Sequence, residues 1–211
     1  MPGALAVQLV GGGGHALVVL DAARAAGMNP TAFWDDDPRA RLRDRVHYAG
    51  TIADLIESAP DAPLVVAIGG IASRRHVIDA LGTRQFATII HPRAVVSSSA
   101  RIGAGSVVFA GAIVNPEARV GAHAIINTGA IVEHECTLGE NVHLAPGSVL
   151  GGGVTIGSDT LIGLGAAVLP LMRIGERCVV AAGAVVTGQI ADRATAIGIP
   201  ARVRGSGRSE S

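Results

Sequence analysis

The chain of 211 residues is 49% hydrophobic but only 2% aromatic, and its 17 arginine and lysine residues balance 17 acidic residues. Because a net charge of zero provides no basic surface, the composition argues against nucleic-acid binding. Residues 1–10 lack the features of a signal peptide and no apolar run reaches transmembrane length, so we expect a cytoplasmic protein without a membrane partner.

The N-terminal region begins with a strand, a glycine turn and a helix. Residues 5–10 predict a buried strand, and residues 17–26 have the apolar spacing of a helix that stops at Gly27. Glycines between them let the backbone approach a phosphate, and the helix N-terminus offers free N–H groups. The pattern also satisfies G-x-G-x-x-A, although a purely structural tight turn is the alternative. The turn consists of Gly11, Gly12, Gly13, Gly14, His15 and Ala16.

The following elements extend this unit into part of a dinucleotide-binding fold. A second strand at 31–34 ends at Asp35, Asp36 and Asp37, where such folds place the acidic residue that binds ribose, unless these acids form only a solvated loop. The unit spans about 90 residues, roughly half of a full dinucleotide fold, so a mononucleotide or nucleotide sugar fits better than NAD. The remaining predicted elements are a strand at 64–69, a helix at 71–81 and a strand at 86–90.

From residue 102 to residue 186 an aliphatic residue recurs at every sixth position. A helix repeats every 3.6 residues and a strand every two, so this period indicates neither. It indicates a triangular parallel β-solenoid in which each hexad forms one short strand and one corner, and three hexads form one coil. The aliphatic side chains then fill the interior, and they are Ile102, Val108, Val114, Val120, Ile126, Val132, Leu138, Leu144, Leu150, Ile156, Ile162, Val168, Ile174, Val180 and Val186.

These two patterns divide the chain into predicted domains. We expect an α/β Rossmann-like domain at 1–92, an all-β parallel β-helix at 93–190, and a C-terminal segment with a disordered tail at 191–211. No low-complexity linker separates the first two, so they should pack against each other. Cys136 and Cys178 occupy small inward positions, which predicts buried thiols rather than a disulfide or a nucleophile.

The polar group Glu133, His134 and Glu135 interrupts the regular solenoid and is the strongest candidate for chemistry. A neutral imidazole beside a carboxylate suits a general base, because the acid fixes the tautomer and stabilises the imidazolium. A surface histidine between surface acids is the alternative. One coil later lies Gly152, flanked by two further glycines, which leaves space for a ligand beside His134.

Two further polar residues accompany this group. Asn127 lies one hexad before Glu133, and His143 follows His134 by half a coil. Half a coil places the two histidines on different faces of one prism. If both serve one site, they must therefore come from different chains.

These features together resemble one enzyme family. The run at 126–136 (Ile-Asn-Thr-Gly-Ala-Ile-Val-Glu-His-Glu-Cys), followed by His143, is similar to the active-site coil of bacterial sugar acetyltransferases grouped with the sialic acid O-acetyltransferases. The glycine turn, the two aspartates, and the segments at 90–92 and 198–201 also match, so the resemblance covers nearly the whole chain. It implies a left-handed β-helix, whose hand breaks the usual crossover rule. The four-glycine turn and Gly70 depart from some members, which leaves the nucleotide base undecided.

The resemblance implies a role for each matching residue. His134 is similar to the general base that deprotonates a sugar amine, Glu135 to its orienting acid, and Asn127 and His143 to groups near the acetyl thioester. A homotrimer with acetyl-CoA between its subunits is implied, without a metal. The implied nucleotide-sugar contacts are Gly11, Gly12, Gly13, Gly14, His15, Asp35, Asp36 and Gly69. Candidate CoA contacts are His143, Gly152, Gly163, Ala182 and Arg202, although Arg202 could be only a solvated charge.

The leading hypothesis is an acetyl-CoA-dependent N-acetyltransferase that acts on the amine of a nucleotide-activated 4-amino-4,6-dideoxy sugar. The amine would attack the thioester directly, with His134 as general base. The alternatives are an O-acetyltransferase acting on a sialic acid or another sugar hydroxyl, and a non-catalytic solenoid that binds sugar nucleotides. The sequence leaves open whether the nucleotide is a uridine, guanosine or thymidine diphosphate.

Overall fold

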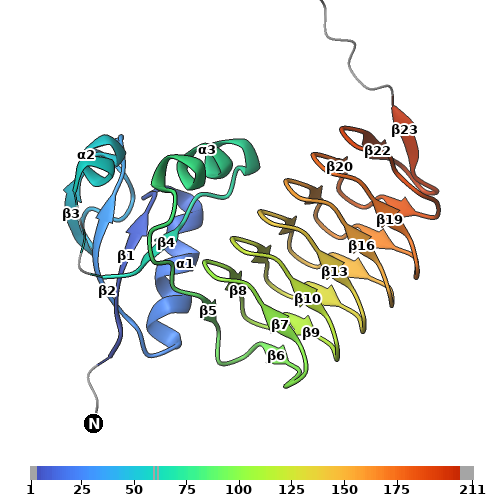
Figure 1. Ribbon diagram of the computed structural model, residues 1–211, viewed down its shortest axis with the longest axis horizontal. Helices are drawn as coiled ribbons and strands as arrows, with labels where there is room; N and C mark the ends of the chain where they lie inside the picture. The colour runs from blue at the N-terminus through green and yellow to red at the C-terminus, as the bar shows by residue number, and fades with distance from the viewer. Residues whose placement is uncertain (1–3, 59, 61, 205–211) are drawn as a thin grey trace, which may run out of the picture.

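A computed structural model describes residues 4–58, 60 and 62–204, so the predicted disordered tail at 205–211 lies outside the described part of the chain. The chain forms an α/β domain followed by a left-handed parallel β-helix, as predicted. Figure 1 shows the α/β domain beside the first coils of the β-helix. None of the helices in these residues is long and apolar enough to span a bilayer.

The N-terminal domain is a four-stranded parallel sheet with the strand order β3-β2-β1-β4. Apolar residues of α1 cover one face of the sheet, and apolar residues of α2 and α3 cover the other. The predicted elements of this domain correspond to β1, α1, β2, β4 and α3. The elements are β1 (Ala6–Val10), α1 (Gly14–Ala25), β2 (Asn29–Trp34), β3 (His47–Gly50), α2 (Ile52–Glu57), β4 (Leu64–Val66) and α3 (Ile71–Leu81).

Two short elements, β3 and α2, were not predicted from the sequence. The strand β3 has only four residues and lies at the sheet edge, where no alternating apolar pattern is required. The helix α2 has six residues, and a capping box fixes its start. In that box the Asp54 backbone N–H donates to Thr51 Oγ1 at 3.1 Å, and the Thr51 N–H donates to Asp54 Oδ2 at 2.8 Å.

The strand predicted at 86–90 does not join the N-terminal sheet, so this prediction is wrong. Phe86 makes only an isolated bridge with Leu64, whereas β5 (Ile89–Ile90) pairs with β8 in the β-helix. The reason is the period of six, because Ile90 and Val96 extend the aliphatic series toward the N-terminus. Strand stacking therefore starts two hexads before Ile102.

The β-helix consists of two-residue strands that pair in parallel with the strand three hexads away, as Ile131 pairs with Val149. Its inward residues form one buried cluster that includes Cys136 and Cys178, and both thiols are free, as predicted. The strands are β6 (Val95–Val96), β7 (Arg101–Ile102), β8 (Val107–Val108), β9 (Ile113–Val114), β10 (Arg119–Val120), β11 (Ile125–Ile126), β12 (Ile131–Val132), β13 (Thr137–Leu138), β14 (His143–Leu144), β15 (Val149–Leu150), β16 (Thr155–Ile156), β17 (Leu161–Ile162), β18 (Ala167–Val168), β19 (Arg173–Ile174), β20 (Val179–Val180) and β21 (Val185–Val186).

The three outer faces of the prism differ in polarity. The first coils of the eight-stranded face are buried under α1, because Val107 and Ile125 pack into the same cluster as Ala16 and Val19. The five-stranded face is polar and carries Arg101, Arg119, Thr137, Thr155 and Arg173. The six-stranded face, here called the apolar face, carries Val95, Ile113, Ile131, Val149, Ala167 and Val185.

Beyond Val186 the stack continues with a shortened coil. Ala196 in β22 (Thr195–Ile197) pairs with Val180, which is 16 residues earlier rather than 18. The strand β23 (Arg202–Arg204) then pairs antiparallel with β22. The two-residue deletion explains why the hexad pattern stops at Val186 although the strands keep stacking.

Glycines at the corners let successive coils approach closely. A Cβ atom added to Gly157 would lie 2.6 Å from the backbone N of Glu176 in the next coil, whereas one added to Gly188 would meet nothing within 4 Å. A side chain at Gly157 therefore forces two backbones apart, and a side chain at Gly188 does not.

We predict that Gly157→Ala lowers the free energy of unfolding by about 1–3 kcal/mol, because it overpacks a backbone contact. Gly188→Ala is the matched control and should change the stability by no more than about 0.5 kcal/mol. Urea unfolding followed by circular dichroism measures both. Equal stability of the two variants would contradict the close approach of the coils at Gly157.

Candidate active site

A cavity of about 1050 Å³ lies between α3 and the later coils of the eight-stranded face. Its wall includes Gly69, Arg75, Asn127, His143, Gly163 and Ala182. Five of these six residues, all except Arg75, were singled out from the sequence, on separate segments of the chain. The packing of the N-terminal domain against the β-helix brings them together.

Hydrogen bonds fix both the orientation and the tautomer of His143. Its Nδ1 lies 3.2 Å from the carbonyl oxygen of Gly69, and because a carbonyl can only accept, Nδ1 carries the proton. Its Nε2 then accepts from the Asn127 amide Nδ2 at 3.2 Å. The Asn127 amide is itself oriented, since its Oδ1 accepts from the Thr128 backbone N–H at 2.9 Å. The result is a neutral, ordered His143–Asn127 pair in the cavity wall.

His15, at the start of α1, lies behind His143. The centroids of their rings are 6.2 Å apart, and the His15 ring packs edge-on against Phe109 at 5.5 Å. Its Nε2 is buried without a hydrogen-bond partner. Burial, assisted by the charge of Arg74, lowers the pKa of His15 to about 4. Burial, assisted by Arg74 and His15, likewise lowers the pKa of His143 to about 4, against the opposing effect of the Gly69 carbonyl.

His134 lies at a different place, on the corner between the six-stranded and five-stranded faces. Its Nδ1 lies 3.0 Å from Glu135 Oε2, and both side chains are exposed. The ring rests on Gly152, where an added Cβ would lie 2.5 Å from Nε2. In a triangular prism this corner is opposite the face that carries His143, so one chain cannot bring the two histidines into one site.

The predicted nucleotide-binding residues gather at the carboxyl ends of β1, β2 and β4. The Gly12 N–H donates to Asp35 Oδ2 at 2.6 Å, and the Ile52 N–H donates to Asp36 Oδ1 at 2.9 Å. An added Cβ at Gly12 would clash with Phe33, whereas Gly13 and Gly14 face open space at the uncapped N-terminus of α1. A site at the switch point between β1 and its two neighbours suits a phosphate group.

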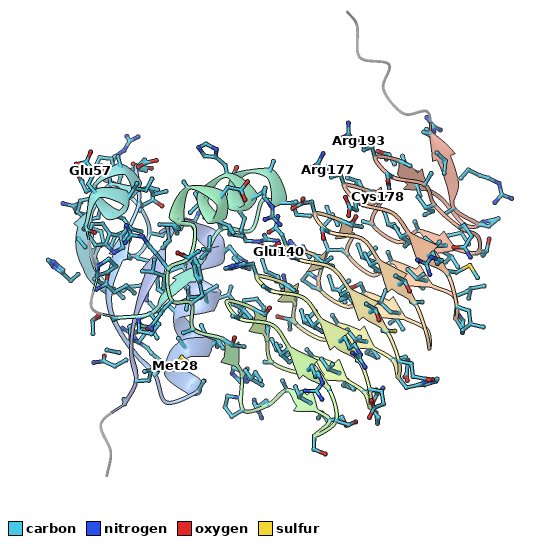
Figure 2. All side chains as sticks on the ribbon, in the orientation of Figure 1. Met28, Glu57, Glu140, Arg177, Cys178 and Arg193 are labelled. Carbon is cyan, nitrogen blue, oxygen red and sulfur yellow. The ribbon has the colours of Figure 1, made fainter. Side chains whose placement is uncertain are left out.

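An ionic network that was not predicted joins α3 to the solenoid beside the cavity. Arg75 Nε donates to Asp159 Oδ1 at 2.9 Å, and its Nη1 donates to Glu140 Oε1 at 3.1 Å. Asp159 Oδ1 also accepts from the Asn141 amide at 2.7 Å, and Figure 2 shows Glu140 and Arg177 along this edge. A sequence signal did exist, because Asn141, Asp159 and Arg177 are spaced by 18 residues and occupy one corner with positive φ.

Two of the predicted CoA contacts lie outside the cavity wall. Gly152 belongs to the His134 corner, and Arg202 is exposed on β23, where its guanidinium donates to the Ala201 carbonyl at 3.1 Å. Arg177 does line the cavity and is half exposed, with its Nε 3.9 Å from Asp159 Oδ2. Across the described ranges, no group of three or more His, Cys, Asp and Glu side chains could hold a metal ion.

Comparison with known proteins assigns the family. The PglD N-terminal domain family matches residues 6–81, the bacterial transferase hexapeptide family (six repeats) matches 117–152, and the hexapeptide repeat of succinyl-transferase matches 153–188. The acetyltransferase domain of PglB from Neisseria gonorrhoeae FA1090 is 35% identical with a TM-score of 0.87, and the match covers 94% of this chain and 99% of that one. The chain belongs to the hexapeptide-repeat sugar acetyltransferases.

Two further members of these acetyltransferases carry substrate names. A histidine mutant of perosamine N-acetyltransferase from Caulobacter crescentus, in complex with CoA and GDP-perosamine, is 41% identical with a TM-score of 0.85, covering 95% of this chain and 97% of that one. UDP-N-acetylbacillosamine N-acetyltransferase from Bacillus subtilis is 39% identical over 110 residues. That match covers 49% of this chain and 51% of the relative, so the aligned part spans about half the length of the curated relative.

The lowered pKa values of His15 and His143 make the fold sensitive to acid. The unfolded chain protonates each near pH 6.5, whereas the folded chain resists protonation until about pH 4. The unfolded state therefore binds more protons between these values, and stability that is present above pH 6.5 is lost as the pH falls toward 4.

We predict that His15 and His143 each contribute about 3 kcal/mol to this loss, and that His143→Gln removes its share of the pH slope. Urea unfolding across this pH range measures the slope. His47→Gln is the control, because His47 is exposed on β3. If the slope in His143→Gln matches that of the unsubstituted chain, the neutral buried state of His143 is wrong.

Proposed function

We propose that this chain is an acetyl-CoA-dependent N-acetyltransferase that acts on the amine of a nucleotide-activated 4-amino-4,6-dideoxy sugar. The observation that carries the mechanism is the hydrogen bond between His134 and Glu135. A carboxylate accepts, so Nδ1 holds the proton and the Nε2 lone pair remains available beside Gly152. This is the arrangement that a general base requires.

The proposed reaction is a direct acyl transfer. The sugar amine attacks the thioester carbonyl carbon while its proton passes to His134 Nε2, and the tetrahedral intermediate expels the CoA thiolate. Glu135 stabilises the imidazolium that forms. The Asn127 amide uses one N–H for His143, so its second N–H is available as a donor to the developing oxyanion. No covalent acyl-enzyme is required.

The cavity beside His143 is the proposed acetyl-CoA site. Its volume of about 1050 Å³ suits an extended cofactor, and small residues such as Gly163 and Ala182 leave backbone groups accessible in its wall. Arg177, with its weak contact to Asp159, is better situated for a CoA phosphate than Arg202. The nucleotide-sugar phosphates are assigned to Gly13 and Gly14 at the N-terminus of α1.

A homotrimer completes the proposed site. His134 and the cavity lie on opposite sides of one prism, so the base must approach the cavity of a neighbouring chain. The apolar face supports this assembly, because Val149 is 38% exposed and Val95 is 64% exposed in the isolated chain. Burial of this face between subunits would remove a continuous strip of aliphatic side chains from water.

The direct test is acetyl transfer from acetyl-CoA, followed as thiol release, to uridine-, guanosine- and thymidine-diphosphate 4-amino sugars. We expect turnover with one of the three, which would identify the base read by the N-terminal domain. Transfer only to sugar hydroxyls would show that the protein is an O-acetyltransferase and not an N-acetyltransferase. An absence of both transfer and acetyl-CoA binding would overturn the proposed function.

We predict that His134→Ala lowers kcat by roughly 10²- to 10⁴-fold, because it removes the general base. The exposed histidine variant His47→Ala should retain full activity, and both variants should unfold at the same temperature as the unsubstituted chain. Steady-state kinetics with the preferred sugar measures the effect. Undiminished kcat in His134→Ala would exclude His134 as the base.

A shared site also predicts complementation between inactive variants. His134→Ala and His143→Ala trimers, unfolded together and refolded as a mixture, should recover about a quarter of the original activity, because some sites then combine two intact histidines. Each variant refolded alone is the control and should remain inactive. Lack of recovery despite mixed trimers, detected by mass spectrometry of the intact assemblies, would place both histidines in the same chain's site.

A further inference from the structure

We propose that Arg74 is a positioning residue that locks the Gly69 carbonyl, and through it the His143 ring, to the β-helix. Its side chain lies behind the cavity and does not line it. Its effect on acetyl-CoA rests on the proposed function, whereas its effect on His143 can be measured without any reaction.

The guanidinium of Arg74 holds three backbone carbonyls at once. Its Nη1 donates to Ile68 O at 2.9 Å and to Gly69 O at 3.0 Å, and its Nη2 donates to Asn141 O at 3.1 Å. The first two carbonyls belong to the loop between β4 and α3, and the third belongs to a corner of the β-helix. Arg74 therefore ties this loop directly to the solenoid.

The Gly69 carbonyl is the shared atom in this arrangement. It accepts from Arg74 and also from His143 Nδ1, at 3.2 Å. The position of this oxygen therefore sets the ring orientation of His143 and holds its proton on Nδ1. His143 Nε2 in turn accepts a hydrogen bond from the Asn127 amide. A displacement of the Gly69 carbonyl would therefore move both His143 and Asn127.

Burial of this side chain is costly, and that cost points to a specific role. Arg74 is only 1% exposed, and within the described chain it has no carboxylate at salt-bridge distance. Its Nε is buried without a partner. A charge buried in this way is destabilising unless its hydrogen bonds are well used. Burial lowers the pKa of Arg74 to about 10, together with the charge of Arg75 and against that of Asp159, so it remains charged near neutral pH.

The charge adds a second effect on the two histidines. Arg74 on α3 and His15 on α1 face His143 from the N-terminal domain. Burial is the largest cause of the lowered pKa of His15 and of His143, and the charge of Arg74 is the second largest. A neutral His143 can accept from Asn127, whereas a protonated one cannot. The other titratable side chains in the cavity wall are Arg75, His76, Asp79, Asp159, Arg177 and Cys178.

Two substitutions separate geometry from charge. Arg74→Lys keeps the charge but loses the planar guanidinium, whose Nη1 and Nη2 together donate to three carbonyl oxygens. Arg74→Met removes both. Arg84→Met is the matched control, because Arg84 also donates to a backbone carbonyl, Ile56 O at 2.7 Å, but lies away from the cavity.

Nitrogen NMR of the full chain labelled at its seven histidines reads the tautomer directly, with His143→Gln identifying the signal of His143. We expect a neutral ring protonated on Nδ1 in the original chain and in Arg84→Met. Arg74→Lys should give a mixture of tautomers, and Arg74→Met should in addition protonate His143 at higher pH. If Arg74→Met does not fold, Arg74→Lys alone decides the outcome.

Kinetics supplies the second readout. Arg74→Lys should lower kcat/KM for acetyl-CoA by about 10- to 100-fold, with kcat reduced as well, because it misplaces His143 and the oxyanion donor Asn127 but leaves His134 intact. Altered His143 signals in a chain that transfers no acetyl group would support the positioning role and overturn only the proposed function. An unchanged His143 spectrum and an unchanged kcat/KM in Arg74→Lys, with active original enzyme, would overturn the positioning role.

Discussion

The filling of the solenoid interior is the constraint on which the rest of the structure depends. Each hexad places one aliphatic side chain and a second inward residue inside a narrow prism, where the few polar side chains, such as Ser106, Ser148 and Thr160, are fully buried. All chemistry must then lie on corners or outer faces. The three faces divide these tasks, with one polar face, one apolar face and one face covered by the N-terminal domain.

The corners supply functional positions because their backbone is already irregular. Glu135, Asn141 and Asp159 adopt positive φ where the chain turns, and stacking aligns such residues in columns along the solenoid. One column presents His134 over Gly152, and another holds Asn141 and Asp159 against α3. The same repeat that packs the core therefore also aligns groups from successive coils.

Docking of the α/β domain converts a regular solenoid face into a walled cavity. Apolar contacts of α1 fix the domain over the first coils, and Arg74 and Arg75 on α3 bind the later ones through carbonyls and carboxylates. His143 lies at the interface between the two domains. It is hydrogen-bonded to the Gly69 carbonyl of the α/β domain and to the Asn127 amide of the β-helix. The geometry of the proposed acetyl-CoA site thus depends on how these two domains meet.

The sequence alone determined the solenoid, the N-terminal α/β unit and the polar groups at His134, His143 and the glycine turn. Strict period and residue chemistry are local properties, so they can be read along the chain. Only the tertiary structure decided the Arg74 and Arg75 contacts with the solenoid and the cavity between α3 and the later coils. These depend on residues about 65–85 positions apart meeting across a domain interface, as Arg74 meets Asn141, and no local pattern specifies such contacts.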